Sequence, residues 1–288
     1  MSTKRTVIVG TGPAGTSVAT ALAAAGVSSL LIGRTPPAAG IAAPCRIRTA
    51  TVFHAEPGRL LVLDKDGVRT EPFDTLVLAT GTYTAELPDG DGRWRAVALH
   101  PEAHLAAALD CAFALDESTA CLVPTRFADG RSSVPWIFVA GGVAGAPDAA
   151  SADADGRLVA ETILRDRDAS GSEPATEPVT RLLAPLAVPL ALPDLAEDFV
   201  ICRSTGVSLD TAKAAIDAGA ADLFRLGQHT TAGAGFCRGR RSWLALTALL
   251  RERTGAPLSD LLHPAFEFPA VSVPLPALAA WHQPESSL

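Results

Sequence analysis

The chain has 288 residues, enough for one large domain or two modest ones. Hydrophobic residues make up 48% of it and charged residues 19%, with a net charge of −7, which describes a globular protein with a sizeable core and argues against a nucleic-acid-binding protein. The sequence contains no uninterrupted apolar run of roughly 18 residues that would predict a membrane span, and its five cysteines do not suggest a disulfide framework.

Residues 6–34 predict half of a Rossmann-like nucleotide-binding fold. A buried strand, Val7 to Val9, is followed by a glycine turn, an alanine-rich helix and a second strand. We expect separate roles for the three glycines of the pattern G-x-G-x-x-G: a tight turn, the approach of a pyrophosphate, and close packing of helix on strand. The helix N-terminus would attract the phosphates. The predicted cofactor-binding residues here are Gly10, Gly12, Pro13, Ala14 and Gly15.

The acidic residue expected at the end of the second strand, where it would hold the ribose hydroxyls, is missing. Its place is taken by Gly33, followed by Arg34. An arginine there can accept a 2′-phosphate, as in NADP sites, so Arg34 is a second candidate contact to the nucleotide. The chain enters the first strand directly from its beginning, which leaves no room for a signal peptide and predicts a cytoplasmic protein.

Residues 48–78 read as a run of strands that includes Val52, with a hairpin turn at Asp66-Gly67. The last of these strands ends in Ala79-Thr80-Gly81, and we expect Val52, Thr80 and Gly81 to line the nucleotide site. Only 54 residues separate Gly81 from Trp136, without a second glycine fingerprint. A nicotinamide-binding domain needs about 100 residues, so we predict that it is absent.

The segment between these points predicts a helix over residues 101–115. His100 and His104 could share its face as metal ligands, although a solvated helix start without a third ligand explains them as well. A further buried strand leads into a second glycine turn at Gly141-Gly142, and residues 155–165 have the spacing of a closing helix.

The rest of the chain divides into three predicted parts after a nucleotide-binding-like domain over residues 1–166. Residues 167–198 are a linker, 199–255 a small helical module and 256–288 a C-terminal tail. The module predicts helices over 209–218, 220–226 and 243–253, with Ser208 capping the first. At about 55 residues it is too small to bury much core alone, so we expect it to lean on a metal, a cluster or a neighbouring domain.

Several of these motifs resemble known families. Gly10 to Gly15, the strand ending in Ala79-Thr80-Gly81 and the strand running into Gly141-Gly142 are similar to the three signatures of two-dinucleotide-binding flavoproteins. In that family the third signature ends in an aspartate that binds the ribityl chain, and here that position is Gly142.

Cys202-Arg203-Ser204 and the stretch GAGFCRGRRS (233–242) resemble the [2Fe–2S] domain of bacterioferritin-associated ferredoxin, whose pattern is C-x-C-E followed by G-M-G-x-C-Q-G-x-x-C. Residues 268–279 are similar to the closing P-V-P-L-x-A-L-A of the flavoprotein subunits of hydrogen cyanide synthase, opine oxidases and dye-linked L-proline dehydrogenases. Taken together, the resemblance covers nearly the whole chain, with large internal deletions.

This resemblance implies an α/β fold, with a truncated Rossmann-like flavoprotein domain plus the helical module. It also implies an accessory subunit, either structural or electron-relaying, of a heteromeric flavin-dependent amine or amino-acid oxidoreductase. The partner would be an oxidase-like FAD subunit, with a small ferredoxin-like subunit as a possible third. Electrons would pass through the cluster, but Ser204 and Ser242 replace two of its four thiolates and leave Cys202 and Cys237. A cluster held by this chain alone is therefore not expected. A cluster would require a partner that supplies the missing ligands.

With Gly33 and Gly142 in place of two acids, the expected occupant is an adenine nucleotide, ADP or ATP, or a weakly held FAD, with an empty pocket as the alternative. The rival interpretation is a free-standing FAD- or NADP-dependent reductase of a small molecule.

Overall fold

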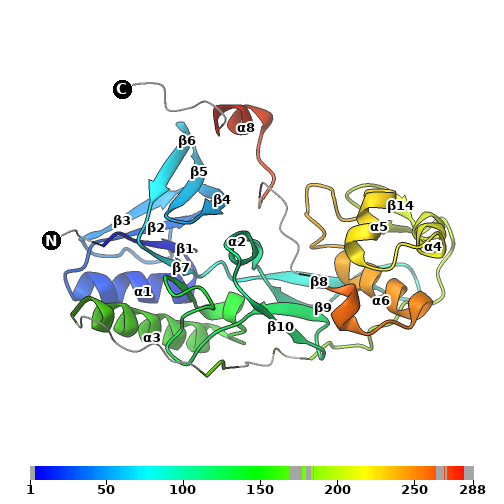
Figure 1. The fold of residues 1–288 in the computed structure, drawn as a ribbon, viewed down its shortest axis with the longest axis horizontal. Helices are drawn as coiled ribbons and strands as arrows, with labels where there is room; N and C mark the ends of the chain where they lie inside the picture. Colours follow the sequence, from blue (N-terminus) through cyan, green and yellow to red (C-terminus); the bar gives the residue numbers. More distant parts are fainter. Residues whose placement is uncertain are drawn as a thin grey trace.

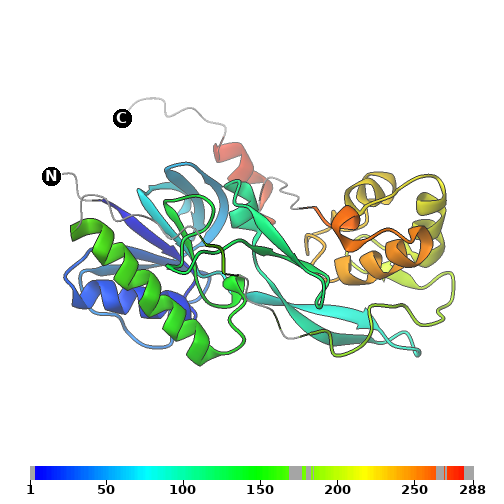
Figure 2. The same ribbon diagram turned by 60° about the horizontal axis from the view of Figure 1, so that its bottom comes forward.

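The computed structural model describes residues 4–168, 177–179, 183, 185–263, 269 and 271–281. A parallel five-stranded sheet forms the core of the N-terminal domain (Figure 1). In spatial order the strands are β12 (Ile137–Val139), β7 (Thr75–Leu78), β1 (Thr6–Val9), β2 (Ser29–Gly33) and β3 (Cys45–Thr49). Helices α1 (Pro13–Ala24) and α3 (Ala149–Asp168) pack side by side on one face (Figure 2).

Both faces of the sheet are buried at β12, β7, β1 and β2, which explains why these strands are nearly continuous apolar runs. The edge strand β3 is polar and largely exposed. Ile8, Leu31 and Val77 point into the core under α1 and α3. Their neighbours along the strands, such as Val7 and Val9, point into a second core on the opposite face. The predicted α/β half-fold is therefore confirmed, and each helix and strand of residues 6–34 lies where the sequence placed it.

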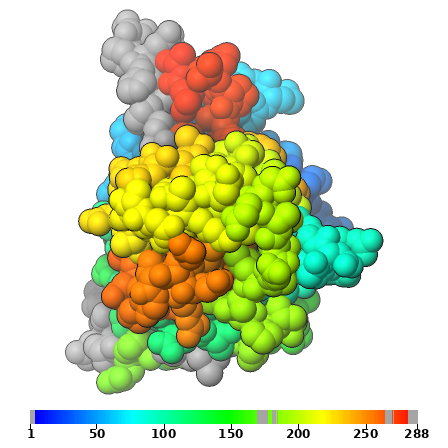
Figure 3. All heavy atoms as spheres, turned by 90° about the vertical axis from the view of Figure 1, so that its right-hand side faces the viewer, coloured from blue at the N-terminus to red at the C-terminus, as the bar shows by residue number. Residues whose placement is uncertain are grey.

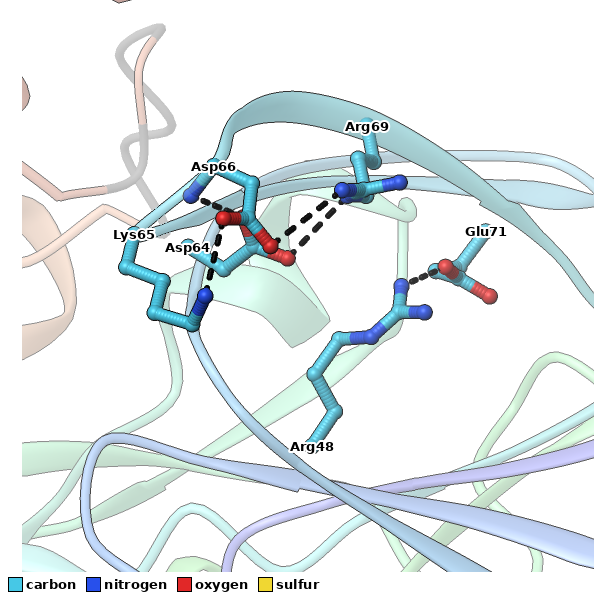
Figure 4. Close-up of polar contacts among 6 residues, drawn as sticks. All are labelled: Arg48, Asp64, Lys65, Asp66, Arg69 and Glu71. Atoms are coloured by element: carbon cyan, nitrogen blue, oxygen red, sulfur yellow. Dashed lines mark hydrogen bonds and ion pairs between the residues drawn. The ribbon is translucent and has the colours of Figure 1, made fainter.

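The second face is covered by a small antiparallel sheet of β4 (Thr51–Glu56), β5 (Arg59–Asp64) and β6 (Gly67–Pro72). The predicted hairpin turn joins β5 to β6, and the backbone N–H of Asp66 donates to Asp64 Oδ1 at 2.8 Å. Arg69 pairs with both aspartates, and Arg48 of β3 pairs with Glu71 of β6 (Figure 4). This last ion pair ties the edge of the parallel sheet to the small sheet.

The segment after Gly81 differs from the expected helix over 101–115. The chain forms a long hairpin of β8 (Thr82–Pro88) and β9 (Trp94–Pro101), and only His104–Ala108 is helical (α2). A second hairpin follows, β10 (Phe113–Asp116) and β11 (Cys121–Pro124), and after β12 comes the short helix η1 (Gly141–Ala144). The alanines and leucines of 101–115 read as helical locally, but tertiary pairing places both ends of the segment in strands.

The long hairpin extends from the sheet to the helical module at the far end of the molecule (Figures 1 and 2). The module contains the strands β13 (Val200–Cys202) and β14 (Val207–Ser208) and the helices α4 (Leu209–Asp217), α5 (Leu223–Thr230), α6 (Trp243–Thr254) and α7 (Leu258–Leu261). Helix α5 begins later than predicted, with Asp222 as its N-cap. Ser208 occupies the N-cap position of α4, but its hydroxyl bonds to Asp210.

The module is indeed supported by a neighbour. Ala85, Leu87 and Val97 of the hairpin share one apolar core with Ile201, Leu226 and Leu246 of the module. Figure 3 shows the hairpin, in cyan, at the edge of the module. Of the predicted linker, the described leucines 183, 186, 190, 192 and 195 pack along the hairpins and the module.

The described part of the tail returns to the first domain, where α8 (Leu275–Trp281) contacts β6. Phe268 and Ala270 of the tail motif lie outside the described residues. Among the described residues, no helix is both long and apolar enough to cross a bilayer.

Candidate functional site

The glycine turn between β1 and α1 has the geometry that the sequence predicts. Gly10 has a φ of +118°, and a Cβ there would lie 2.0 Å from the carbonyl oxygen of Ala79, which directly follows β7. A Cβ on Gly15 would lie 1.9 Å from the oxygen of Gly10, so helix and strand pack as closely as expected. At Gly12 a Cβ would meet nothing within 4 Å. The space that a pyrophosphate needs beside the start of α1 is open.

A cavity of about 700 Å³ lies at the carboxyl ends of β1, β2 and β7. Ligands bind at this edge in open α/β sheets. Of the predicted cofactor-binding residues, the lining includes Gly10, Arg34, Val52 and Thr80. The sequence did not indicate the other wall, which contains Tyr83, Glu102, His104, Cys237 and Arg240. The cavity therefore lies between the Rossmann-like domain and the helical module.

The remaining predicted residues are not part of this lining, and several have packing roles. A Cβ on Gly141 would lie 2.7 Å from Cβ of Ala14, so these two small residues let η1 approach α1. The backbone N–H of Gly141 donates to Asp155 Oδ2 at 3.1 Å. Gly12, Pro13 and Gly15 form the start of α1, and Gly81 and Gly142 lie against each other.

Both positions that lack the expected acid are filled by a neighbouring threonine. A Cβ on Gly33 would lie 2.5 Å from Cγ2 of Thr11, whose hydroxyl donates to the oxygen of Thr35 at 2.9 Å. A Cβ on Gly142 would lie 2.8 Å from Cγ2 of Thr82. The space beside Gly12 is therefore open, whereas threonine side chains pack against Gly33 and Gly142 at the two positions where the sequence led us to expect acids.

Three polar side chains of the cavity's second wall join the segment after β9 to the module. Arg240 of the module donates to Glu102 through Nε at 2.6 Å and Nη2 at 2.7 Å, and His104 Nδ1 lies 2.8 Å from Glu102 Oε1. Burial raises the pKa of Glu102, but the hydrogen bonds from His104 and Arg240 outweigh it and lower the pKa to about 2. The Thr80 hydroxyl donates to the backbone oxygen of Glu102 at 2.6 Å, which holds the Glu102 backbone beside the carboxyl ends of the strands.

The proposed pairing of His100 and His104 as metal ligands is wrong. His100 lies on β9, where its Nε2 is 2.9 Å from the oxygen of Thr119, and burial lowers its pKa to about 4. His104 begins α2 and faces Glu102. Each ring is held by its own neighbour rather than by a shared site.

The four positions that resemble cluster ligands converge in the module. Cys202 accepts hydrogen bonds from the hydroxyls of Thr205 at 3.1 Å and Ser242 at 3.4 Å, and from the N–H of Gly233 at 3.4 Å. Ser204 Oγ lies 3.6 Å from the same sulfur. Burial raises the pKa of Cys202, but these hydrogen bonds prevail and lower it to about 7.

These residues do not fit a [2Fe–2S] cluster. Such a cluster requires four soft donors, and Ser204 and Ser242 supply hydroxyls that stay protonated at neutral pH. The side chains also bond directly to one another, since Cys237 Sγ donates to Ser204 Oγ at 3.2 Å. Within the described residues, no group of three or more histidine, cysteine, aspartate or glutamate side chains is placed to hold a metal.

A second cavity of about 400 Å³ lies between α2, the second hairpin and the module, and its lining is largely apolar. Tyr83 and His104 line both cavities, and His104 stacks on Trp243 with ring centroids 6.0 Å apart. Nothing in the local sequence pattern indicated this space, because its walls come from distant segments.

The fold has relatives among solved structures. L-proline dehydrogenase from P. horikoshii superposes with a TM-score of 0.74 at 17% sequence identity, over 96% of this chain and 79% of that chain. Thioredoxin reductase from T. acidophilum gives a TM-score of 0.41 at 15% identity, over 58% of this chain and 100% of that chain. The chain has a Rossmann-like α/β fold. No protein-family model matches the sequence, and no curated protein is significantly similar to it.

The likeness to L-proline dehydrogenase includes the module as well as the nucleotide-binding half, because it extends over 96% of this chain. The predicted fold class is confirmed. At this level of identity the comparison concerns the fold, and the chemistry has to be argued from the site.

Proposed function

We propose that this chain is a cytoplasmic accessory subunit of a heteromeric flavin-dependent amine or amino-acid oxidoreductase. Its partners would be an oxidase-like FAD subunit, which carries the catalysis, and a small ferredoxin-like subunit. The proposal rests on two observations together: this chain matches the fold of L-proline dehydrogenase along almost its whole length, and the side chains expected to bind a flavin, with two of the four expected to bind a cluster, are absent. The chain keeps the fold over 96% of its length, while threonines fill the acid positions and serines occupy two of the four ligand positions.

The proposed ligand of the larger cavity is an adenine nucleotide. Its phosphates would lie at the open start of α1 beside Gly12, and its adenosine would lie toward Arg34 and Val52. ADP or ATP is favoured over FAD, because Thr82 fills the space where the acid that binds the ribityl chain would stand. When bound, an adenine nucleotide supplies anchoring between the domain and the module rather than redox chemistry.

A substitution at Gly12 tests the nucleotide site. Gly12→Val places a branched side chain in the open space beside α1, so we expect at least a tenfold loss of affinity, about 1.4 kcal/mol. Gly40→Val is the matched control, since a Cβ there also meets nothing within 4 Å. The measurement is nucleotide released per chain on denaturation, by mass spectrometry, with titration calorimetry of ADP and FAD. Equal retention by the two variants would place any nucleotide elsewhere.

A second candidate function is a free-standing FAD- or NADP-dependent reductase of a small molecule. The observation in its favour is that Cys237, Glu102 and His104 line the same cavity as the nucleotide edge, so polar and sulfur side chains are at hand for chemistry. Arg34 would then contact a 2′-phosphate.

Purification separates these two functions. The chain is produced alone and together with the products of neighbouring genes, and each preparation is analysed for flavin, metal and nucleotide. The accessory role predicts a stable complex with an oxidase-like chain and a colourless isolated chain. A yellow isolated chain that oxidises NADH or NADPH would establish the reductase instead.

A further inference from the structure

Two sulfur atoms in the module face the same hydroxyl group. Cys237 Sγ donates to Ser204 Oγ at 3.2 Å, and Cys202 Sγ lies 3.6 Å from that oxygen. The two cysteines are 35 positions apart in sequence, and the fold brings them together from β13 and from the loop before α6. Both sulfur atoms are therefore in contact with the Ser204 hydroxyl.

The two cysteines differ in environment. Cys202 is fully buried and accepts hydrogen bonds from Thr205, Ser242 and the N–H of Gly233, all of which stabilise a thiolate. Cys237 is 8% exposed and lines the 700 Å³ cavity. An external reagent can therefore reach Cys237 from the cavity, whereas Cys202 is fully buried and does not line it.

The other cysteines lack this arrangement. Cys111 and Cys121 bond to Ser132 and Thr119, and burial raises the pKa of both thiols. Cys45 is half-buried on β3 and donates to the oxygen of Arg46. Pairing at Cys202 and Cys237 would thus be selective.

We propose that Cys202 and Cys237 form a redox-active dithiol, which occupies the place of the cluster and exchanges two electrons with a disulfide-bearing small molecule or peptide. The inference goes beyond the proposed function and does not depend on a bound partner or nucleotide. It follows from the residues that stand where a cluster would need its ligands. Two sulfurs and two hydroxyls cannot replace four thiolates, but the sulfurs of Cys202 and Cys237 are sufficient for a disulfide.

The exchange proceeds in two balanced steps. The Cys237 thiolate attacks one sulfur of the external disulfide, which forms a mixed disulfide and releases one thiol. The Cys202 thiolate then attacks Cys237 Sγ, which forms the Cys202–Cys237 bond and releases the second thiol. The two protein thiols lose two electrons and two protons, and the external disulfide gains them. The reverse sequence reduces the protein.

The test uses the full-length chain, treated with chelator and reductant and then equilibrated with glutathione buffers of increasing disulfide content. After rapid alkylation, intact mass and peptide mapping report the state of each cysteine. We expect the loss of two hydrogens and a peptide that links Cys202 to Cys237, with Cys45, Cys111 and Cys121 still alkylated. Wild-type protein that carries glutathione without the internal bond, or in which both cysteines stay free, overturns the proposal.

Two variants assign the order of the steps. Cys202→Ser should hold glutathione on Cys237 at least ten times longer than wild type, because the resolving thiolate is missing. Cys237→Ser should take up no glutathione at Cys202. Cys111→Ser is the matched control and should form the wild-type disulfide. Circular dichroism and thermal melting check that each variant is folded. An adduct on Cys202, or one on Cys237 that decays at the wild-type rate in Cys202→Ser, contradicts the mechanism.

Discussion

Cys202 is a buried sulfur whose charge is set by the hydroxyl groups around it. The hydroxyl of Ser242 affects the ionisation of Cys202, because it donates a hydrogen bond to Cys202 Sγ. Hydrogen bonds to the charged form of a group favour that form. The hydroxyl of Ser242 therefore favours the thiolate form of Cys202.

The first prediction follows from this contact. Ser242→Ala removes the hydrogen bond that contributes most to lowering the pKa of Cys202. We expect the pKa to rise from about 7 toward its ordinary value of 9.0, so less thiolate is present at neutral pH. Ultraviolet absorbance of the thiolate, followed as a function of pH, measures the shift. Ser259→Ala, at an exposed position on α7, is the control, and a titration identical to wild type in Ser242→Ala would contradict the assignment.

At the scale of elements, the long hairpin of β8 and β9 has two attachments. Its first strand begins directly after Thr80-Gly81, beside the carboxyl edge of the sheet. Farther along it, Ala85, Leu87 and Val97 pack in the core of the module, whereas Gly90 and Asp91 of its turn are exposed. The contact between Glu102 and Arg240 reinforces the base, since it joins the end of the hairpin to the loop that carries Cys237. The Rossmann-like half and the module are therefore joined both by this ion pair and by the shared apolar core.

The second prediction concerns that ion pair. Glu102→Gln leaves the guanidinium of Arg240 buried without its counter-charge, which costs about 3 kcal/mol of unfolding free energy. Glu102 has a lowered pKa, so its contribution is complete above its ordinary value of 4.5 and is lost as the pH falls toward 2. Denaturant unfolding at several pH values measures this. Glu197→Gln, from an exposed pair with Lys213, should cost less than about 0.5 kcal/mol.

If Glu102→Gln and Glu197→Gln destabilise the protein equally, the pair at the cavity contributes nothing beyond an ordinary surface contact. A difference that persists at pH 2 would show that the carboxylate charge is not its source.

The third prediction concerns the ligand positions of the module. Ser204→Cys combined with Ser242→Cys restores four thiols at positions that the fold already brings together. Anaerobic reconstitution with iron and sulfide should then give a brown protein with an electron paramagnetic resonance signal on reduction. Ser204→Cys combined with Ser259→Cys is the control with equal cysteine content. The absence of colour in the first variant would mean that the module has lost more than ligands.

At the scale of the whole molecule, the sequence predicts what local pattern determines. The turn from Gly10 to Gly15 and helix α6 lie where expected, because strand runs, glycines and the helix stop at Gly255 are local signals. The filling of Gly33 by Thr11 and the pairing of Glu102 with Arg240 were missed, since they join segments 22 and 138 positions apart. Nothing in the periodicity of residues 101–115 distinguishes a helix from paired strands whose partners lie elsewhere.

The fourth prediction tests whether the module depends on the rest of the molecule. Residues 185–263 produced alone lack Ala85, Leu87 and Val97, which complete their core. We expect this fragment to lack a cooperative thermal transition, whereas the full chain melts cooperatively. Circular dichroism makes the comparison, and adding residues 82–101 through a flexible linker should restore the transition. A fragment that melts as the full chain does would mean that the module folds independently.

The shared core also has a consequence for synthesis on the ribosome. The hairpin emerges well before the helices that cover it, since Glu102 precedes Arg240 by 138 residues. At translation rates of about 5–20 residues per second, the apolar side chains of the hairpin remain unpacked for on the order of ten seconds, until the module has been synthesised. During that interval Leu87 and Val97 are exposed to solvent on the nascent chain and can make non-native apolar contacts. We therefore expect folding of this protein to depend on ribosome-associated chaperones, although these residues are buried in the folded molecule.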